Sequence, residues 1–405
     1  MRAWAFLTAL LLIVATFFAC SSSGDDDNDS GASDDDDNDN DDNDDDDDDN
    51  NDDNDSVDDD DDDDDDDNDD DNDDNDNDDD NDDNDDTYVP PSPVYGYYQE
   101  GGPGSWDWLT AQLPVFAADG LTLFLGIMDT DLGTDGLRDF LLAAQTAGVE
   151  VRAWVLLPYE DGYWANEMNA EKFAAEALAY ADWFAAEGLP VEWIVVDMEM
   201  DINRINQLNQ YVQNGQYLEA LTLLLANWNP ERFAFAVDVY AQLVADLNER
   251  GFRTMVVTYP IVLDDLADGD ASLQDLLDVP ISGVPWHEVS TMVYSSTYEE
   301  YLPLDFTAYF AYDYARATVE YFGDRASIAL GVSGQMTDPQ VLADEIAASK
   351  AAGVERIQVY SYAGSAGHAD PDLWHATFTA PAQTPPPDFP TWLVREGGRL
   401  VDELF

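Results

Sequence analysis

A short unit recurs six times after residue 88: a helix-like stretch ends on a glycine, and an apolar, strand-like stretch follows at once. The strand-like stretches are LTLFLGI, VEVRAWVLL, LPVEWIVV, FRTMVVTY, DRASIALGV and VERIQVYSY. Glycine just past a helix end is typical of a left-handed cap. Near-continuous apolar strands are typical of parallel sheets that are buried on both faces. The unit therefore predicts an α/β fold in which helices alternate with parallel strands.

Two further segments, VYGYY and VSTMVY, bring the number of predicted strands to eight. Eight such units over about three hundred residues predict a single (β/α)8 TIM barrel spanning 88–405. The alternative is a doubly wound open sheet, but GGPGSW after the first strand lacks the spacing of a dinucleotide-binding loop. An extra helix is expected within 202–250, and a short terminal helix should close the bottom or side of the barrel. The predicted strands are 94–98, 121–127, 149–157, 191–197, 253–259, 289–294, 326–332 and 356–362.

The segment before this domain is almost entirely Asp and Asn from Asp25 to Asp86, and the whole chain has a formal net charge of -76. Such a tract has too little apolar surface to offset the entropy of ordering, so 21–87 is predicted to be a disordered spacer. Weak, diffuse Ca2+ binding is the alternative role, but no Ca2+-loop spacing is present. The strong negative charge argues against a nucleic-acid partner.

The N-terminus carries Arg2, then an apolar run and Cys20, the only cysteine in the chain. This arrangement predicts a secretory signal over 1–20. The sequence TFFAC followed by SSSG resembles a bacterial lipoprotein lipobox, which implies lipidation of Cys20. The expected location is therefore extracytoplasmic, on a lipid anchor in the outer membrane or at the cell surface. An ordinary signal peptide and an unprocessed anchor are the alternatives.

The segment VEWIVVDMEMD ends a predicted buried strand with three acids at alternate positions. Side chains alternate along a strand, so Asp197 and Glu199 should face the same way. They should lie at the C-terminal end of the barrel strands, where TIM-barrel enzymes carry their catalytic residues. Aromatic and acidic residues gather at or near the other strand ends, with few basic residues, which suits a polyhydroxylated, neutral ligand such as an oligosaccharide. The candidate substrate-binding residues are Tyr98, Glu100, Asp129, Trp154, Tyr159, Trp164, Asp201, Tyr259, Gln335 and Tyr360.

A pair of carboxyl groups in such a basin is what glycoside hydrolysis requires. Glu199 is the candidate acid, because it has the longer side chain and lies nearer the mouth. Asp197 behind it would support the transition state or organise the nucleophile. The alternative is a structural role, in which these acids cap a helix or pair with a nearby base such as Arg204.

The segment 192–199 also resembles the strand-four signature of glycoside hydrolase family 18, the chitinases and endo-β-N-acetylglucosaminidases, whose pattern is D-x-x-D-x-D-x-E. Asp197 and Glu199 match its last two acids, while Val195 stands at its middle Asp. TMVYSS is similar to that family's M-x-Y, so Tyr294 would contact the substrate N-acetyl group. Tyr360 stands where the family often has Trp. The resemblance implies that the acetamido oxygen of the substrate attacks the anomeric carbon while Asp197 orients it.

Other chemistries find little support in the sequence. His287, His368 and His375 lack metal-ligand spacing, no G-x-S-x-G motif is present, and Cys20 precedes the fold, so no metal or cofactor is expected. Two functions remain: a surface-anchored, monomeric glycosidase acting on a polysaccharide that contains N-acetylhexosamine, or a non-catalytic barrel that binds glycan. Val195 favours the second.

Overall fold

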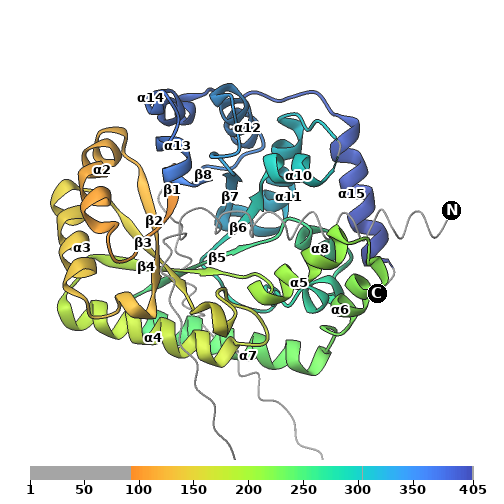
Figure 1. Ribbon diagram of the computed structural model, residues 1–405, viewed down its shortest axis with the longest axis horizontal. Coiled ribbons are helices and arrows are strands. Elements are labelled where there is room, and N and C mark those ends of the chain that lie inside the picture. Colours follow the sequence, from red (N-terminus) through yellow and green to blue (C-terminus); the bar gives the residue numbers. More distant parts are fainter. Residues whose placement is uncertain (1–92, 303, 404–405) are drawn as a thin grey trace, which may run out of the picture. The chain divides into compact units, whose positions relative to one another are not determined.

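The computed structural model describes residues 93–302 and 304–403 (Figure 1). The predicted signal sequence, Cys20 and the Asp/Asn tract lie outside the described residues. Within the described ranges, the helices are all too short or too polar to cross a lipid bilayer.

Eight parallel strands close into one barrel in sequence order, which confirms the predicted fold class (Figure 1). The barrel closes where β1 pairs with β8, with Val94 opposite Arg356 and Tyr98 opposite Tyr360. Each observed strand overlaps its predicted range, and no end differs by more than two residues. The strands are β1 (Val94–Glu100), β2 (Thr122–Met128), β3 (Val151–Leu156), β4 (Val191–Asp197), β5 (Arg253–Thr258), β6 (Glu288–Val293), β7 (Ala326–Gly331) and β8 (Arg356–Tyr360).

Helices surround the strands on the outside of the barrel (Figure 1). They are α2 (Trp106–Asp119), α3 (Asp135–Ala147), α4 (Ala170–Glu187), α5 (Ile202–Gln213), α6 (Tyr217–Leu225), α7 (Pro230–Glu249), α8 (Val262–Asp268), α9 (Ser272–Leu276), α10 (Ser295–Tyr301), α11 (Tyr309–Phe322), α12 (Pro339–Ala351), α13 (Tyr362–Ala366), α14 (Pro371–His375) and α15 (Phe389–Asp402).

The segment between β4 and β5 contains α5, α6 and α7, so it has two extra helices where the sequence predicted one. Gly215, with φ of 70°, lies in the turn between α5 and α6. Asn229 then caps α7, because its side chain accepts a hydrogen bond from the Arg232 backbone N–H, and Pro230 occupies the first turn. The terminal helix α15 packs against α8, α9 and α11, which places it at the side of the barrel.

The glycines of the repeating unit do end their helices in left-handed or related conformations. Gly120 has φ of 63° and caps α2, with its N–H donating to the Phe116 carbonyl. Gly188, with φ of 62°, caps α4 in the same way through the Phe184 and Ala185 carbonyls. A residue with a Cβ pays a steric cost in this conformation. These glycines therefore fix where each outer helix stops and each barrel strand begins.

The interior of the barrel below the mouth is filled partly by a buried ion pair. Arg152 from β3 donates to Glu288 from β6 at 2.9 Å, and both side chains are almost fully buried. The Arg152 guanidinium also lies over the Phe124 ring, at 5.3 Å, and over the Trp193 ring, at 4.2 Å. Arg152 is the only basic residue of β3, and its charge is paired with Glu288 beneath the strand ends.

Among the glycines of the described ranges, Gly96 on β1 has the least room for a Cβ, and this supplies a test of the fold. A Cβ on Gly96 would lie 2.1 Å from the Thr122 carbonyl oxygen and 2.9 Å from Phe124 Cε2. Because the Thr122 carbonyl oxygen belongs to the backbone of the adjacent strand, Gly96→Ala should destabilise the protein by about 1–3 kcal/mol or more. Denaturant midpoints would measure this. Gly334→Ala is the matched control, since its Cβ would meet only Gly364 Cα at 3.4 Å; an unchanged Gly96→Ala midpoint would contradict the observed packing of β1 on β2.

Candidate active site

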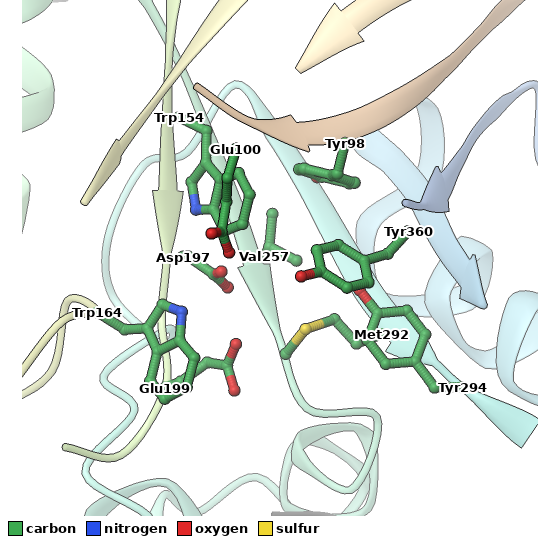
Figure 2. Close-up of a pocket in the computed structure, with 10 residues that line it drawn as sticks. All are labelled: Tyr98, Glu100, Trp154, Trp164, Asp197, Glu199, Val257, Met292, Tyr294 and Tyr360. Atoms are coloured by element: carbon green, nitrogen blue, oxygen red, sulfur yellow. The ribbon is translucent and has the colours of Figure 1, made fainter. Parts of the chain in front are cut away.

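The end of β4 is held between a loop and the next strand. The Ala165 N–H donates to the Asp197 carbonyl at 2.9 Å, and the Glu199 N–H donates to the Ala165 carbonyl at 3.0 Å. On the other side, the Met198 N–H donates to the Val257 carbonyl at 2.8 Å. These bonds continue the extended geometry past the last residue of β4. Asp197 and Glu199 therefore keep the alternation of the strand and face the same cavity (Figure 2).

Asp197 and Glu199 form one buried acid pair. Their side chains are hydrogen-bonded to each other, and the residues are only 6% and 2% exposed. Burial raises the pKa of Asp197 well above its usual value, and the neighbouring Glu199 raises it further, while an interaction with Trp154 lowers it. A hydrogen bond between two carboxyl groups requires a proton on one of them. Burial and mutual repulsion therefore favour the state in which one of the two carboxyl groups is protonated.

Val195 lies one layer below this pair and is fully buried. An apolar side chain at this position cannot share the proton of Asp197. The hydrogen-bonding partner of Asp197 lies instead on the mouth side, at Glu199.

The pair lines a pocket of about 370 Å³, counting its opening to solvent. Figure 2 shows side chains from several strands of the barrel turned toward this space. The pocket brings together eight of the residues chosen from the sequence and adds Val257 and Met292. The lining residues are Tyr98, Glu100, Trp154, Trp164, Asp197, Glu199, Val257, Met292, Tyr294 and Tyr360.

Aromatic rings form the walls of the pocket. Trp154 meets Tyr98 edge to face, with ring centroids 5.4 Å apart, and it meets Tyr360 similarly at 6.3 Å. Tyr294 lies beside Tyr360, with centroids 6.1 Å apart. Trp164 lies near Glu199 in the view of Figure 2. Flat rings at the walls with polar groups between them suit the faces and hydroxyls of a sugar.

Glu100 is a third carboxyl group in the same pocket. It is the last residue of β1. Burial raises the pKa of Glu100, and hydrogen bonds from the side chains of Tyr163 and Tyr360 lower it by a smaller amount. The charge of Glu100 also raises the pKa of Asp197. The lining residues thus include three acids and no Lys, Arg or His.

Five of the residues chosen from the sequence lie outside the pocket lining. Asp129 is exposed in a turn after β2, and Tyr159 is 49% exposed and stacked on Tyr163. Asp201 caps α5 by accepting from the Asn203 N–H, and the Tyr259 hydroxyl accepts from the Met200 N–H. Gln335 accepts hydrogen bonds from Ser296 and Thr297.

The acids at and after the end of β4 differ in their roles. The capping role considered for the acids applies to Asp201. Arg204, the proposed base, has its nearest acidic partner in Asp278, at 3.8 Å. Asp197 and Glu199 line the pocket.

Val257 and Met292 are pocket residues that the sequence did not single out. Val257 lies opposite Asp197 in the pairing of β4 with β5, and Met292 lies two residues before Tyr294 on β6. The signal that could have found them is strand alternation, because residues two apart share a face.

One group of acids in the described ranges has oxygen atoms close enough to share a cation. It consists of Asp265, Asp270 and Asp402, whose carboxylate oxygens lie within 4.8 Å of one another. Asp265 already accepts hydrogen bonds from the Leu273 and Gln274 backbone N–H groups and from the Gln274 side chain. Asp265 therefore holds the start of α9, and the pocket lining includes none of the three acids.

No family model and no curated protein sequence matches this chain. Among solved structures, the glycoside hydrolase domain of PgaB (BpsB) from Bordetella bronchiseptica has a TM-score of 0.47 at 12% identity, covering 73% of this chain and all of that one. D-allulose 3-epimerase from Methylomonas sp. scores 0.40 at 12% identity, covering 78% of this chain and 97% of that one. Active domain 2 of a thermostable chitinase from Pyrococcus furiosus, complexed with chito-oligosaccharides, scores 0.39 at 11% identity, covering 78% and 97%. These likenesses assign no function.

Proposed function

We propose that the protein is a glycoside hydrolase that cleaves a polysaccharide containing N-acetylhexosamine, with Glu199 as the acid. The observation that carries this proposal is the buried Asp197–Glu199 pair in a pocket walled by aromatic rings, where burial and mutual repulsion favour a proton on one of the two carboxyl groups. Protonation of the leaving oxygen by a carboxyl group is the step that glycosidic cleavage requires.

In the proposed mechanism, Glu199 gives its proton to the glycosidic oxygen as the bond to the anomeric carbon breaks. The acetamido oxygen of the same sugar forms a new bond to that carbon. With the single proton of the pair placed on Glu199, the Asp197 carboxylate accepts a hydrogen bond from the acetamido N–H. Asp197 Oδ1 is buried and has no hydrogen-bond partner among the described residues, so it can take that role. Water then attacks the cyclic intermediate and returns a proton to Glu199. Tyr294 lines the same pocket and would contact the acetamido group.

A glycan-binding barrel without catalysis would need the aromatic walls but not the acid pair. Burying two carboxyl groups next to each other costs stability, because desolvation and mutual repulsion both disfavour ionisation. A cost of this kind is typical of a catalytic site. The acid pair therefore favours the enzyme over the binding module.

Incubation of the purified full-length protein with a panel of polysaccharides tests this function. We expect new reducing ends from polymers that contain N-acetylhexosamine, and none from otherwise similar glucans, because only the former carry the attacking acetamido group. Cleavage of glucans alone would contradict acetamido assistance. Binding of oligosaccharides by calorimetry, with no cleavage of any polymer, would favour the non-catalytic barrel.

We also propose that Cys20 is lipidated and that the Asp/Asn tract separates the barrel from the membrane. The lipobox-like TFFAC sequence and the absence of any other cysteine support this anchor. Cys20→Ala should move the protein from the membrane fraction to the soluble fraction and abolish incorporation of labelled palmitate. Ser21→Ala is the control, and it should leave both unchanged. Membrane retention of Cys20→Ala, without palmitate in the wild type, would contradict the anchor.

A further inference from the structure

Three aromatic rings connect the pocket lining with the surface of the protein. Trp164 lines the pocket, and Tyr163 meets it edge to face with ring centroids 5.1 Å apart. Tyr159 stacks on Tyr163, with centroids 4.5 Å apart and an angle of 17° between the ring planes. Because Tyr159 is 49% exposed, this row of rings runs from the pocket to solvent.

Helix α5 continues from Tyr159 with a row of polar side chains. The Asn203 side chain donates a hydrogen bond to the Tyr159 carbonyl at 3.0 Å, and the Gln207 side chain donates to the Tyr211 hydroxyl at 3.0 Å. Residues four apart lie on one face of a helix, so Asn203, Gln207 and Tyr211 form one row. At a rise of about 1.5 Å per residue, this row runs roughly 12 Å along α5, away from the pocket.

The row ends at a groove between α5 and α6, two helices that pack against each other (Figure 1). The groove has a volume of about 720 Å³, counting its opening to solvent. Tyr211 forms the α5 side. The α6 side combines apolar surface with a hydroxyl and a carboxyl group, and its lining residues are Leu218, Glu219, Thr222, Leu223 and Ala226. An aromatic ring with apolar surface and a few polar groups suits a sugar chain.

The outer surface of α6 also indicates that this part of the molecule binds something. Leu218 is 71% exposed, and Tyr217 and Leu225 are exposed as well. Exposed apolar surface of this kind is typical of a binding site. Glu219 is the only charged residue of α6. The chain has a net charge of -76, so a second copy would be repelled, whereas an uncharged glycan would not.

We propose that the groove between α5 and α6 binds an uncharged stretch of the same polysaccharide, outside the pocket, so that long chains are cleaved in preference to short ones. This inference rests on the proposed function. Tyr159 and Tyr211 would contact sugar rings, and the amides between them would bind hydroxyl groups. A contact remote from the acid pair holds the ground state and the transition state equally, so it should act on KM rather than on kcat.

Oligomers of two lengths test the inference. Acetylated chitotriose and acetylated chitohexaose would be given to the full-length wild type, and their kcat/KM values compared. Only the longer oligomer can occupy the pocket and the groove together, so we expect it to be preferred by roughly 10-fold or more. The preference should come from a lower KM. Equal kcat/KM values for the two oligomers would overturn the inference.

Tyr211→Ala identifies the groove as the cause of the preference. This variant should raise the KM for chitohexaose to near that for chitotriose. Ala226→Arg, which places a long side chain in the groove and leaves Tyr211 intact, should have the same effect. Tyr312→Ala is the matched control, because Tyr312 is half-buried like Tyr211 but lies on α11, outside the groove and the pocket lining. A preference that both groove variants retain would overturn the inference.

Calorimetry separates a failure of this inference from a failure of the proposed function. If neither oligomer is cleaved, the proposed hydrolase fails, and the binding of the two oligomers to the full-length protein decides the role of the groove. Tighter binding of chitohexaose that is lost in Tyr211→Ala would support a glycan site there. Equal or undetectable binding of both oligomers would overturn it.

Light scattering tests the other occupant of the groove, a second copy of the chain. We expect the full-length wild type and Ala226→Arg to have the same mass in solution. A dimer in the wild type that Ala226→Arg dissociates would assign the groove to contact between two copies, and would overturn the glycan site.

Discussion

Glu199→Gln should lower kcat on an N-acetylhexosamine oligosaccharide by roughly 10²–10⁴-fold, the usual contribution of a general acid. The amide keeps the size of the side chain but cannot give a proton to the leaving oxygen. Binding of the oligosaccharide, measured by calorimetry, should survive, because the aromatic walls of the pocket are unchanged. Steady-state kinetics and calorimetry on the same preparations make this comparison.

Glu192→Gln is the matched control for this loss. Glu192 lies on β4, the strand that ends at Asp197, is exposed, and forms an ion pair with Arg253 at 3.6 Å. The same chemical change there should leave kcat within about 2-fold, since surface ion pairs contribute little. A Glu199→Gln variant that is as active as Glu192→Gln would show that another group protonates the leaving oxygen.

Asp197→Asn should make the enzyme slower and the fold more stable. The rate should fall because the acetamido N–H would lose its negative partner, and the shared proton would lose one of its two sites. Stability should rise because Asn removes a buried group whose charged form is disfavoured by burial and by Glu199. Opposite effects on rate and stability are typical of residues kept for function.

The stability gain of Asp197→Asn should depend on pH with a definite sign. The pKa of Asp197 is raised in the folded state above its ordinary 3.8, so the folded protein binds more protons than the unfolded chain above about pH 4. Wild-type stability therefore falls as pH rises through this range, and each tenfold difference in proton affinity between the two states corresponds to about 1.4 kcal/mol. Denaturant midpoints at several pH values should show the gain at neutral pH and little of it at pH 3. A gain that is larger at pH 3 would contradict the raised pKa.

The sequence predicted the barrel and its acid pair because both depend on short-range patterns. Glycine caps and apolar strands are local signals, and strand alternation alone places Asp197 and Glu199 on one face. The segment after β4 was less predictable. The sequence predicted one extra helix there, and the structure has two, α5 and α6, on either side of the turn at Gly215. The sequence of α5, INRINQLNQYVQ, is rich in Asn and Gln, so its apolar periodicity is weak.

Residues that depend on long-range contacts were harder to place. Tyr259 lies just past β5 and Tyr360 ends β8, yet Tyr259 supports the backbone at Met200 while Tyr360 lines the pocket. Asp129 follows β2 and Glu100 ends β1, but a turn carries Asp129 outward. Which strand end faces the cavity depends on the loop that follows and on the register between strands. Neither is encoded in the residue types at the strand end.

The configuration of the first product tests the central claim most directly. Attack by the acetamido oxygen on one face of the sugar, then by water on the other, inverts the anomeric carbon twice, so the product should keep the configuration of the substrate. Proton NMR during the first minutes of cleavage would distinguish the two anomers before they interconvert. A product that first appears with retained configuration is the predicted result. Inverted configuration would show that water attacks directly, and would contradict cleavage assisted by the substrate's own acetamido group with Asp197 as its partner.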